Sequence, residues 1–212
     1  MIQNFCVVYQ TGDIAYHVRN TSNSVLISGC RSFQITGPAV AVEDTHEFNL
    51  SSNVFCWHTE EGVRLRNCNW GTITGNEVID TGSYNPGTRD TTTMFCDIET
   101  EIPLYDGISL ENCQGFTING NAIFNWPVCP KMDVGIRLDA GCFKNSIVGN
   151  NINYYETADV MTEGAETVVA NNVGYSDKPF QSAEAVGTTI QSFYTRLTDN
   201  FIADVIGTVN PQ

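Results

Sequence analysis

Apolar residues along most of this chain come in short alternating runs that are separated by turn residues, and the runs repeat at a regular interval. Ile27, Leu50 and Ile73 occupy equivalent positions 23 residues apart, and the same pattern returns around Ile118 and Ile147. Alternating apolar positions predict short strands with one buried face. A repeat of this length is typical of a solenoid, in which each repeat forms one coil.

Each repeat contains three such runs in a constant order. In one repeat they are Val63-Arg64-Leu65, Thr72-Ile73-Thr74 and Val78-Ile79, and a Gly75-Asn76 bend precedes the last run. The bend returns in the next repeats as Gly120-Asn121 and Gly149-Asn150. Three short strands per coil predict an all-β parallel β-helix of about six coils.

Two columns of like residues support this prediction. One asparagine follows the central strand of each coil, at positions 53, 76, 121, 150 and 172. Stacked asparagines can satisfy one another and the neighbouring backbone, whereas a single buried amide would lose its hydrogen bonds. A second column consists of Cys68, Cys113 and Cys142, which we expect to pack as small buried hydrophobic side chains.

The Gly75-Asn76-Glu77-Val78 and Gly120-Asn121-Ala122-Ile123 segments carry a resemblance to a known group of proteins. Over about residues 14–174 the chain resembles the pectate-lyase-like superfamily of right-handed parallel β-helices, which includes polysaccharide lyases, glycoside hydrolases, epimerases and bacteriophage tailspikes. The resemblance implies a right-handed, single-stranded parallel β-helix and a polysaccharide ligand. A fold does not fix a function, and the chain lacks the motifs Asn-Thr-Asp, Gly-His-Gly and Asp-Pro-His-Glu, so no catalytic residue carries over.

Composition narrows the classes of partner. The 212 residues carry a formal net charge of −14, which disfavours nucleic acid and anionic membranes. No apolar run is long enough for a membrane span, and the first residues lack the features of a signal peptide. We expect residues 1–175 to form the β-helix and residues 176–212 to form a C-terminal cap or a trimerisation segment, because an open solenoid end must be covered.

Cysteine and histidine do not predict a metal site. The chain has eight cysteines without a CxxC motif, and its histidines at positions 17, 46 and 58 lack ligand spacing. Cys96 and Cys129 are the pair best placed for a disulfide, because both lie in long loops.

The repeat is interrupted at two places, and such insertions tend to carry binding or catalysis. The longer insertion covers residues 80–105 and the shorter one covers residues 125–133, each just before the first strand of a coil. We expect them to lie side by side along the outer face of the first sheet, where the resembled superfamily commonly has its saccharide groove. The candidate substrate-binding residues are Tyr84, Tyr105, Trp126, Trp57 and Arg64.

A column of outward residues supplies the candidate chemistry. The position after the last apolar residue of each first strand is occupied by Arg19, Glu43, Arg66, Glu111, Asp139 and Glu163. The last three would form a stack of carboxylates, with Arg137 as their cationic partner, and these four are the candidate catalytic residues. Their spacing suits a glycoside hydrolase. It also suits a lyase in which Ca²⁺ is bound by the carboxylates and Arg137 either abstracts a proton or clamps the charge of the substrate. An ordinary solvated face is the structural alternative.

Three functional classes follow. The first is a tailspike-type β-helix, homotrimeric and exposed on a virion or outside a cell, that recognises and can degrade a polysaccharide. The second is a free extracellular polysaccharide lyase or glycoside hydrolase. The third is a structural or adhesive β-helix without enzymatic activity.

Overall fold

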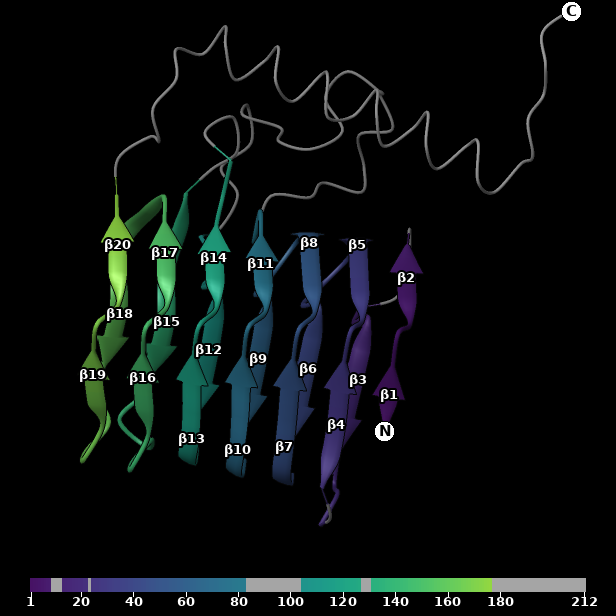
Figure 1. The fold of residues 1–212 in the computed structure, drawn as a ribbon, viewed down its shortest axis with the longest axis horizontal. Coiled ribbons are helices and arrows are strands. Elements are labelled where there is room, and N and C mark those ends of the chain that lie inside the picture. The colour runs from purple at the N-terminus through teal and green to yellow at the C-terminus, as the bar shows by residue number, and fades with distance from the viewer. Residues whose placement is uncertain (9–12, 23, 83–103, 127–130, 177–212) are drawn as a thin grey trace, which may run out of the picture. The chain divides into compact units, whose positions relative to one another are not determined.

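The computed structural model describes residues 1–8, 13–22, 24–82, 104–126 and 131–176 of the chain. These residues form three parallel sheets that run side by side along one axis (Figure 1). Three predictions concern residues outside the described ones: the Cys96 and Cys129 pair, Tyr84, and the C-terminal cap, of which only residue 176 is described. Within that described part, no helix could cross a membrane.

Each coil contributes one strand to each sheet. Sheet A consists of β1 (Ile2–Gln3), β4 (Val25–Ser28), β7 (His46–Ser51), β10 (Asn69–Thr74), β13 (Gln114–Asn119), β16 (Ser146–Val148) and β19 (Val168–Ala170). Sheet B consists of β2 (Cys6–Val8), β5 (Arg31–Ile35), β8 (Val54–His58), β11 (Glu77–Ile79), β14 (Ala122–Phe124), β17 (Asn151–Asn153) and β20 (Val173–Tyr175). Sheet C consists of β3 (Tyr16–Arg19), β6 (Val40–Glu43), β9 (Val63–Arg66), β12 (Ile108–Glu111), β15 (Met132–Leu138) and β18 (Tyr155–Thr162). Sheet C is the first sheet of the sequence prediction.

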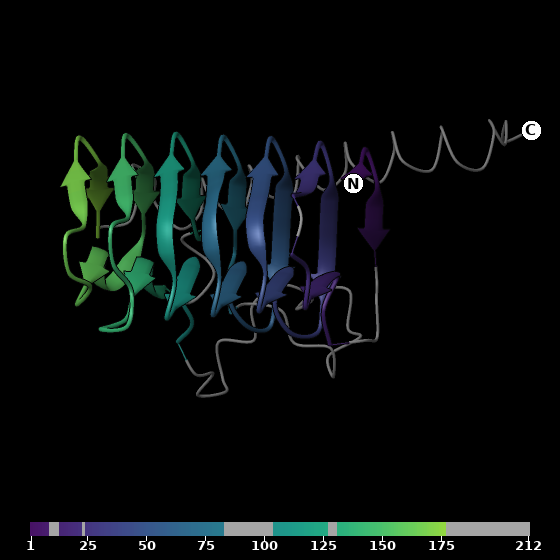
Figure 2. The ribbon, with the colours of Figure 1, turned by 90° about the horizontal axis from the view of Figure 1, so that it is seen from below.

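Strand pairing confirms the predicted parallel β-helix of about six turns. The chain passes from sheet C to sheet A to sheet B in every turn, and each strand pairs in parallel with its equivalents in the neighbouring turns (Figure 2). Ile73 is in register with Leu50 on one side and Ile118 on the other, and all three are fully buried. The core is therefore a set of stacked apolar columns.

The asparagine column is also confirmed, and it links successive coils through side chains. Asn121 Oδ1 accepts hydrogen bonds from the backbone N–H of Asn76 at 3.0 Å and from its Nδ2 at 2.9 Å. The Nδ2 group of Asn121 donates to the carbonyl of Ile73 and to Asn150 Oδ1, both at 2.9 Å. The amide is 1% exposed, so its hydrogen bonds all come from protein groups rather than bulk water.

The cysteine column packs as predicted. Cys68, Cys113 and Cys142 are buried, and each thiol donates to a backbone carbonyl, at 3.1 to 3.4 Å. Thr45 occupies the corresponding position one coil earlier, where its hydroxyl donates to the Glu43 carbonyl at 2.8 Å. The position therefore needs a small side chain with one donor.

We expect the substitution Asn121→Ala to lower the free energy of unfolding by about 3 kcal/mol, because it removes the acceptor of two buried donors of Asn76, its backbone N–H and one of the two N–H bonds of Nδ2. Urea denaturation monitored by circular dichroism would measure the change. The matched control is Asn151→Ala, at an exposed position one coil further along. Equal losses in the two variants would contradict a stabilising role for the column.

Candidate functional site

The two insertions begin and end beside each other. The backbone N–H of Thr81 donates to Asn125 Oδ1, and Asn125 Nδ2 donates to the Thr81 carbonyl, both at 2.9 Å. At their other ends, the N–H of Asp133 donates to the carbonyl of Tyr105 at 2.9 Å. The described ends of both insertions therefore lie at the junction of sheets B and C. The segments 83–103 and 127–130 are outside the described residues, so their predicted position along sheet C stays a prediction.

Asp80 joins the start of one insertion to that of the other. Its Oδ2 accepts a hydrogen bond from the indole N–H of Trp57 at 2.9 Å, and its Oδ1 accepts one from the backbone N–H of Trp126 at 2.6 Å. The carboxyl is fully buried, and this burial raises its pKa to about 7.

The two tryptophans predicted to bind substrate have different surroundings. Trp57 is only 7% exposed and its indole N–H is bonded to Asp80, so it offers little open face to a ligand. Trp126 is partly exposed, and its ring meets that of Phe124 edge-on, with 6.0 Å between the centroids.

Two arginines on the outer face of sheet C hold groups of carboxylates. The Arg137 Nε and Nη2 atoms donate to the two oxygens of Asp106 at 2.7 and 3.2 Å, and Nη2 also donates to Asp133 at 2.7 Å. Arg64 lies two coils away in sheet C and contacts Glu60 at 3.1 Å and Glu61 at 3.5 Å. We call these six residues, together with Tyr105, the sheet C cluster.

Burial changes the acidity of two carboxyls in this cluster. The pKa of Glu61 is raised by burial, although the Arg64 guanidinium opposes the increase. Burial also raises the pKa of Asp106, against the opposing hydrogen bonds from Arg137. The Asp106 carboxylate in turn raises the pKa of Arg137. The cluster therefore holds a guanidinium that stays charged and carboxyls that protonate more readily than usual.

The predicted carboxylate stack exists only as a column of backbone positions. Glu111 is in register with Arg66 and forms a two-pronged ion pair with it, at 2.8 and 3.1 Å. Asp139 Oδ1 accepts hydrogen bonds from the backbone N–H groups of Asn112 and Gly141, at 2.9 and 3.1 Å, and so holds a turn. Glu163 is exposed. Glu111 and Asp139 thus each bind a partner outside the stack, and a reactive role for the three carboxylates stays a prediction.

Arg137 makes its ion pairs outside the column, with Asp106 and Asp133. Its raised pKa disfavours the neutral guanidine that a proton abstractor requires. Among the described residues, no group of three or more His, Cys, Asp or Glu side chains could hold a metal ion.

Sequence reasoning missed Glu61, Asp106 and Asp133 as site residues. A signal for two of them was available, because Glu61-Gly62 and Asp106-Gly107 occupy equivalent positions at the start of sheet C strands. A Cβ atom at either glycine would lie closer than 3 Å to a neighbouring atom, which fixes the backbone beside each carboxylate. Such a geometry is repeated from coil to coil, so it is recognised in the sequence only when the coils are aligned with one another.

The fold and the sheet C cluster define a parallel β-helix protein with a charged outer face. The chain belongs to the NosD family, described as periplasmic copper-binding protein (NosD), whose family model matches residues 6–173. No curated protein matches the chain in sequence.

Solved structures of other β-helix proteins resemble this one at low identity. A putative glycosyl hydrolase from Parabacteroides merdae is 7% identical with a TM-score of 0.47, over 80% of this chain and 82% of that one. The enzymatically active domain of tailspike protein 2 from bacteriophage CBA120 is 16% identical with a TM-score of 0.41, over 81% of this chain. Full-length tailspike protein 2 is 17% identical with a TM-score of 0.41, over 69% of this chain. The chain spans 24% and 20% of the two tailspike chains.

The described residues do not fit a copper centre. Copper prefers thiolate, thioether and imidazole ligands that converge on one point. Hydrogen bonding to Cys142 and Cys68, and then burial, raises the pKa of Cys113, so its sulfur remains a protonated thiol. His58 is buried with its Nε2 3.2 Å from the Ser32 hydroxyl, and among the described residues no group of three or more His, Cys, Asp or Glu side chains could hold a metal ion. No step of the function proposed below depends on copper.

We expect stability to depend on pH through Asp80. Its pKa of about 7 in the folded protein exceeds the ordinary value of 3.8, so between these values the folded state binds the extra proton and stability falls as pH rises. Asp80→Asn should remove most of this slope in urea denaturation between about pH 4 and pH 7. Glu77→Gln makes the same charge change at an exposed position of β11 and should keep the slope. An unchanged slope in Asp80→Asn would contradict the assignment.

Proposed function

We propose that this protein binds a neutral polysaccharide across the outer face of sheet C and hydrolyses it at the sheet C cluster. The observation that carries the proposal is the pairing of Arg64 with Glu61 and of Arg137 with Asp106, beside the ends of both insertions. Glycoside hydrolysis generally uses two carboxyl groups that lie in different environments.

The cluster offers hydrogen-bonding groups suited to sugar hydroxyls. Arg64 and Arg137 lie two coils apart in sheet C, roughly 10 Å along the axis, and present guanidinium donors at both positions. Tyr105 directly precedes Asp106 in the chain and is partly exposed. Its ring can cover the apolar face of a sugar. A saccharide chain lying along the axis would meet both groups.

Charge favours a neutral substrate and hydrolysis. The cluster contains four carboxyls, from Glu60, Glu61, Asp106 and Asp133, against two guanidinium groups, and the whole chain carries a net charge of −14. An acidic polysaccharide would be repelled from this surface. Because β-elimination by a lyase requires a uronate substrate, hydrolysis is favoured over elimination.

The carboxyls divide into two roles. Glu61 is the proposed general acid, because burial raises its pKa and keeps a proton available for the leaving oxygen. Asp106 and Asp133 both accept hydrogen bonds from the Arg137 guanidinium, which holds their oxygens in place to activate water or to stabilise positive charge on the sugar. Arg137 is a positioning residue for this pair.

The proposal includes a tailspike-type assembly, in which three copies of the chain associate. A homotrimer on a virion or outside a cell would place several sheet C faces on one particle and raise the avidity for a repetitive glycan. Light scattering of the full chain tests it, and a monomer at all concentrations would leave the free extracellular enzyme as the remaining form.

We expect Glu61→Gln to reduce hydrolysis at least about a hundredfold and leave stability nearly unchanged, because it removes the proton donor but keeps the shape. The assay measures new reducing ends after incubation with a panel of neutral and acidic polysaccharides. The control Glu77→Gln makes the same change at an exposed position of β11 outside the cluster and should stay within a few-fold of the parent. Unsaturated uronate products would show a lyase instead. Binding without any product would show a non-enzymatic β-helix.

A further inference from the structure

A second surface of the solenoid has a hollow that the sheet C cluster does not use. It lies at the corner where the chain turns from sheet C into sheet A, and it has a volume of about 390 Å³. Two rows of side chains line it: Asp44, Asn67 and Asn112 in one, and His46, Asn69, Gln114 and Phe143 in the other. We call it the corner groove, and it follows the solenoid axis across successive coils.

The first row is a ladder of amides held at fixed spacing. Asn67 Nδ2 donates to Asp44 Oδ1 at 3.1 Å, and Asn112 Nδ2 donates to Asn67 Oδ1 at 2.9 Å. All three residues have positive φ, between 49° and 53°, a conformation that asparagine and aspartate adopt at low cost. Each amide has two N–H donors and two oxygen lone pairs, so one ladder bond on each side leaves capacity for a ligand.

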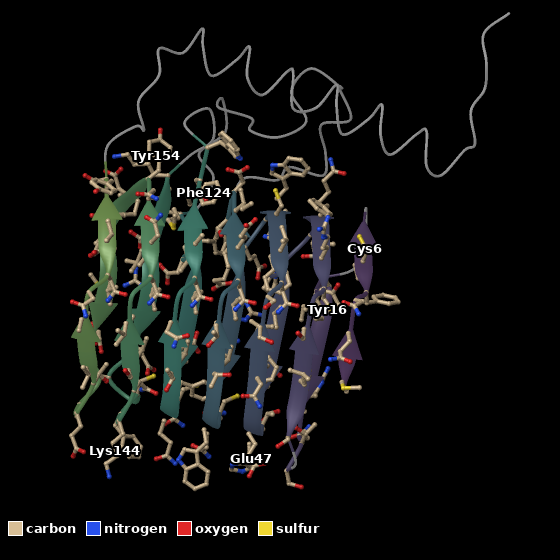
Figure 3. The ribbon with its side chains drawn as sticks, viewed as in Figure 1. Cys6, Tyr16, Glu47, Phe124, Lys144 and Tyr154 are labelled. Atoms are coloured by element: carbon tan, nitrogen blue, oxygen red, sulfur yellow. The ribbon has the colours of Figure 1, made fainter. Side chains whose placement is uncertain are left out.

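An exposed tryptophan adjoins the second row. Glu47, Trp70, Gly115, Lys144 and Glu166 occupy equivalent places at the start of sheet A, and all five have positive φ. Figure 3 labels Glu47 and Lys144 at this edge. Trp70 is 61% exposed, and its indole lies across Gly115, where a Cβ atom would be 2.2 Å from Trp70 Cδ1. The glycine therefore leaves room for the ring to lie flat.

A second aromatic residue bounds the other end. Phe143 is 39% exposed and lines the groove, and the Lys144 ammonium lies 5.8 Å from the centroid of its ring. The corner thus combines two exposed rings with a row of amides. Aromatic rings with an exposed apolar face beside fixed hydrogen-bonding groups are typical of saccharide-binding sites.

We propose that the corner groove binds a neutral saccharide chain lying along the solenoid axis, with Trp70 stacked on one sugar ring and the amides of Asn67, Asn69, Asn112 and Gln114 bonded to hydroxyls. Amides recognise hydroxyls without requiring charge. The Asp44 carboxylate in the groove disfavours an acidic ligand. The coil spacing of about 4.8 Å presents a new amide at each step along the ligand.

This inference does not rest on the proposed hydrolysis, because the groove and the sheet C cluster share no residue. The groove would hold the polymer while the cluster acts on it or on another chain. Binding at the corner groove and cleavage at the cluster therefore have separate tests.

The test uses the full chain on an array of immobilised neutral and acidic glycans, followed by calorimetric titration with the soluble oligosaccharide of the glycan retained. We expect Trp70→Ala to weaken binding by at least about tenfold, since it removes the stacking surface. Gln114→Ala should weaken it less. Tyr175→Ala removes a ring of the same 61% exposure from β20 and should bind as the parent does.

Intrinsic fluorescence separates the site from its alternatives. Trp70 is exposed, Trp57 is buried, and the partly exposed Trp126 lies outside the corner groove, so the emission change caused by the oligosaccharide in the parent should be largely lost in Trp70→Ala. Glu61→Gln should keep this binding in full, whatever its effect on cleavage. The proposal is overturned if the parent retains no neutral glycan, or if Trp70→Ala and the parent bind equally; a protein partner that requires Trp70 without any glycan binding would also overturn it.

Discussion

The structure depends on hydrogen bonds that each coil makes with the coils on either side of it. Parallel strands satisfy their backbone groups only through neighbours, and the buried asparagines extend the same dependence to side chains. A shift of one coil by one residue would break both kinds of bond and would turn the apolar columns outward. Register is therefore fixed along the solenoid, apart from one irregularity between Met132 and Val134 where β15 pairs with β18, and outward positions acquire defined neighbours at about 4.8 Å.

Fixed register explains why the fold was predictable. The interval between Ile27, Leu50 and Ile73 identifies equivalent positions, and the structure places these three residues in one buried column. Insertions leave the register intact: Thr74 and Asn119, which are 45 residues apart, still pair. The positions of Arg66, Glu111 and their equivalents in one outward column follow from the same rule.

The chemistry of the outward face was less predictable, because long side chains choose among several neighbours. Arg137 could have faced Asp139 on its own strand, yet it turns toward the opposite end of the strand and pairs with Asp106 and Asp133. Glu111 similarly pairs with Arg66. Trp57 follows an apolar run and reads as an exposed contact, but its φ of 61° breaks the alternation and the ring is buried. Which partner a side chain contacts depends on distances between neighbouring coils, and the spacing of residues along one coil does not give these distances.

Positive φ values also explain why the corner groove escapes detection in the sequence. The left-handed residue at Trp70 and its equivalents interrupts the alternation, so Asn69 and Trp70 both face outward before the inward pattern resumes at the next position. Alternation alone would assign Asn69 to the interior. The same irregularity recurs in several coils, and repetition converts a local deviation into a continuous surface. In a solenoid, functional surfaces therefore arise in two ways: from insertions, which add residues to one coil, and from corners, where a small feature of each coil is repeated along the axis.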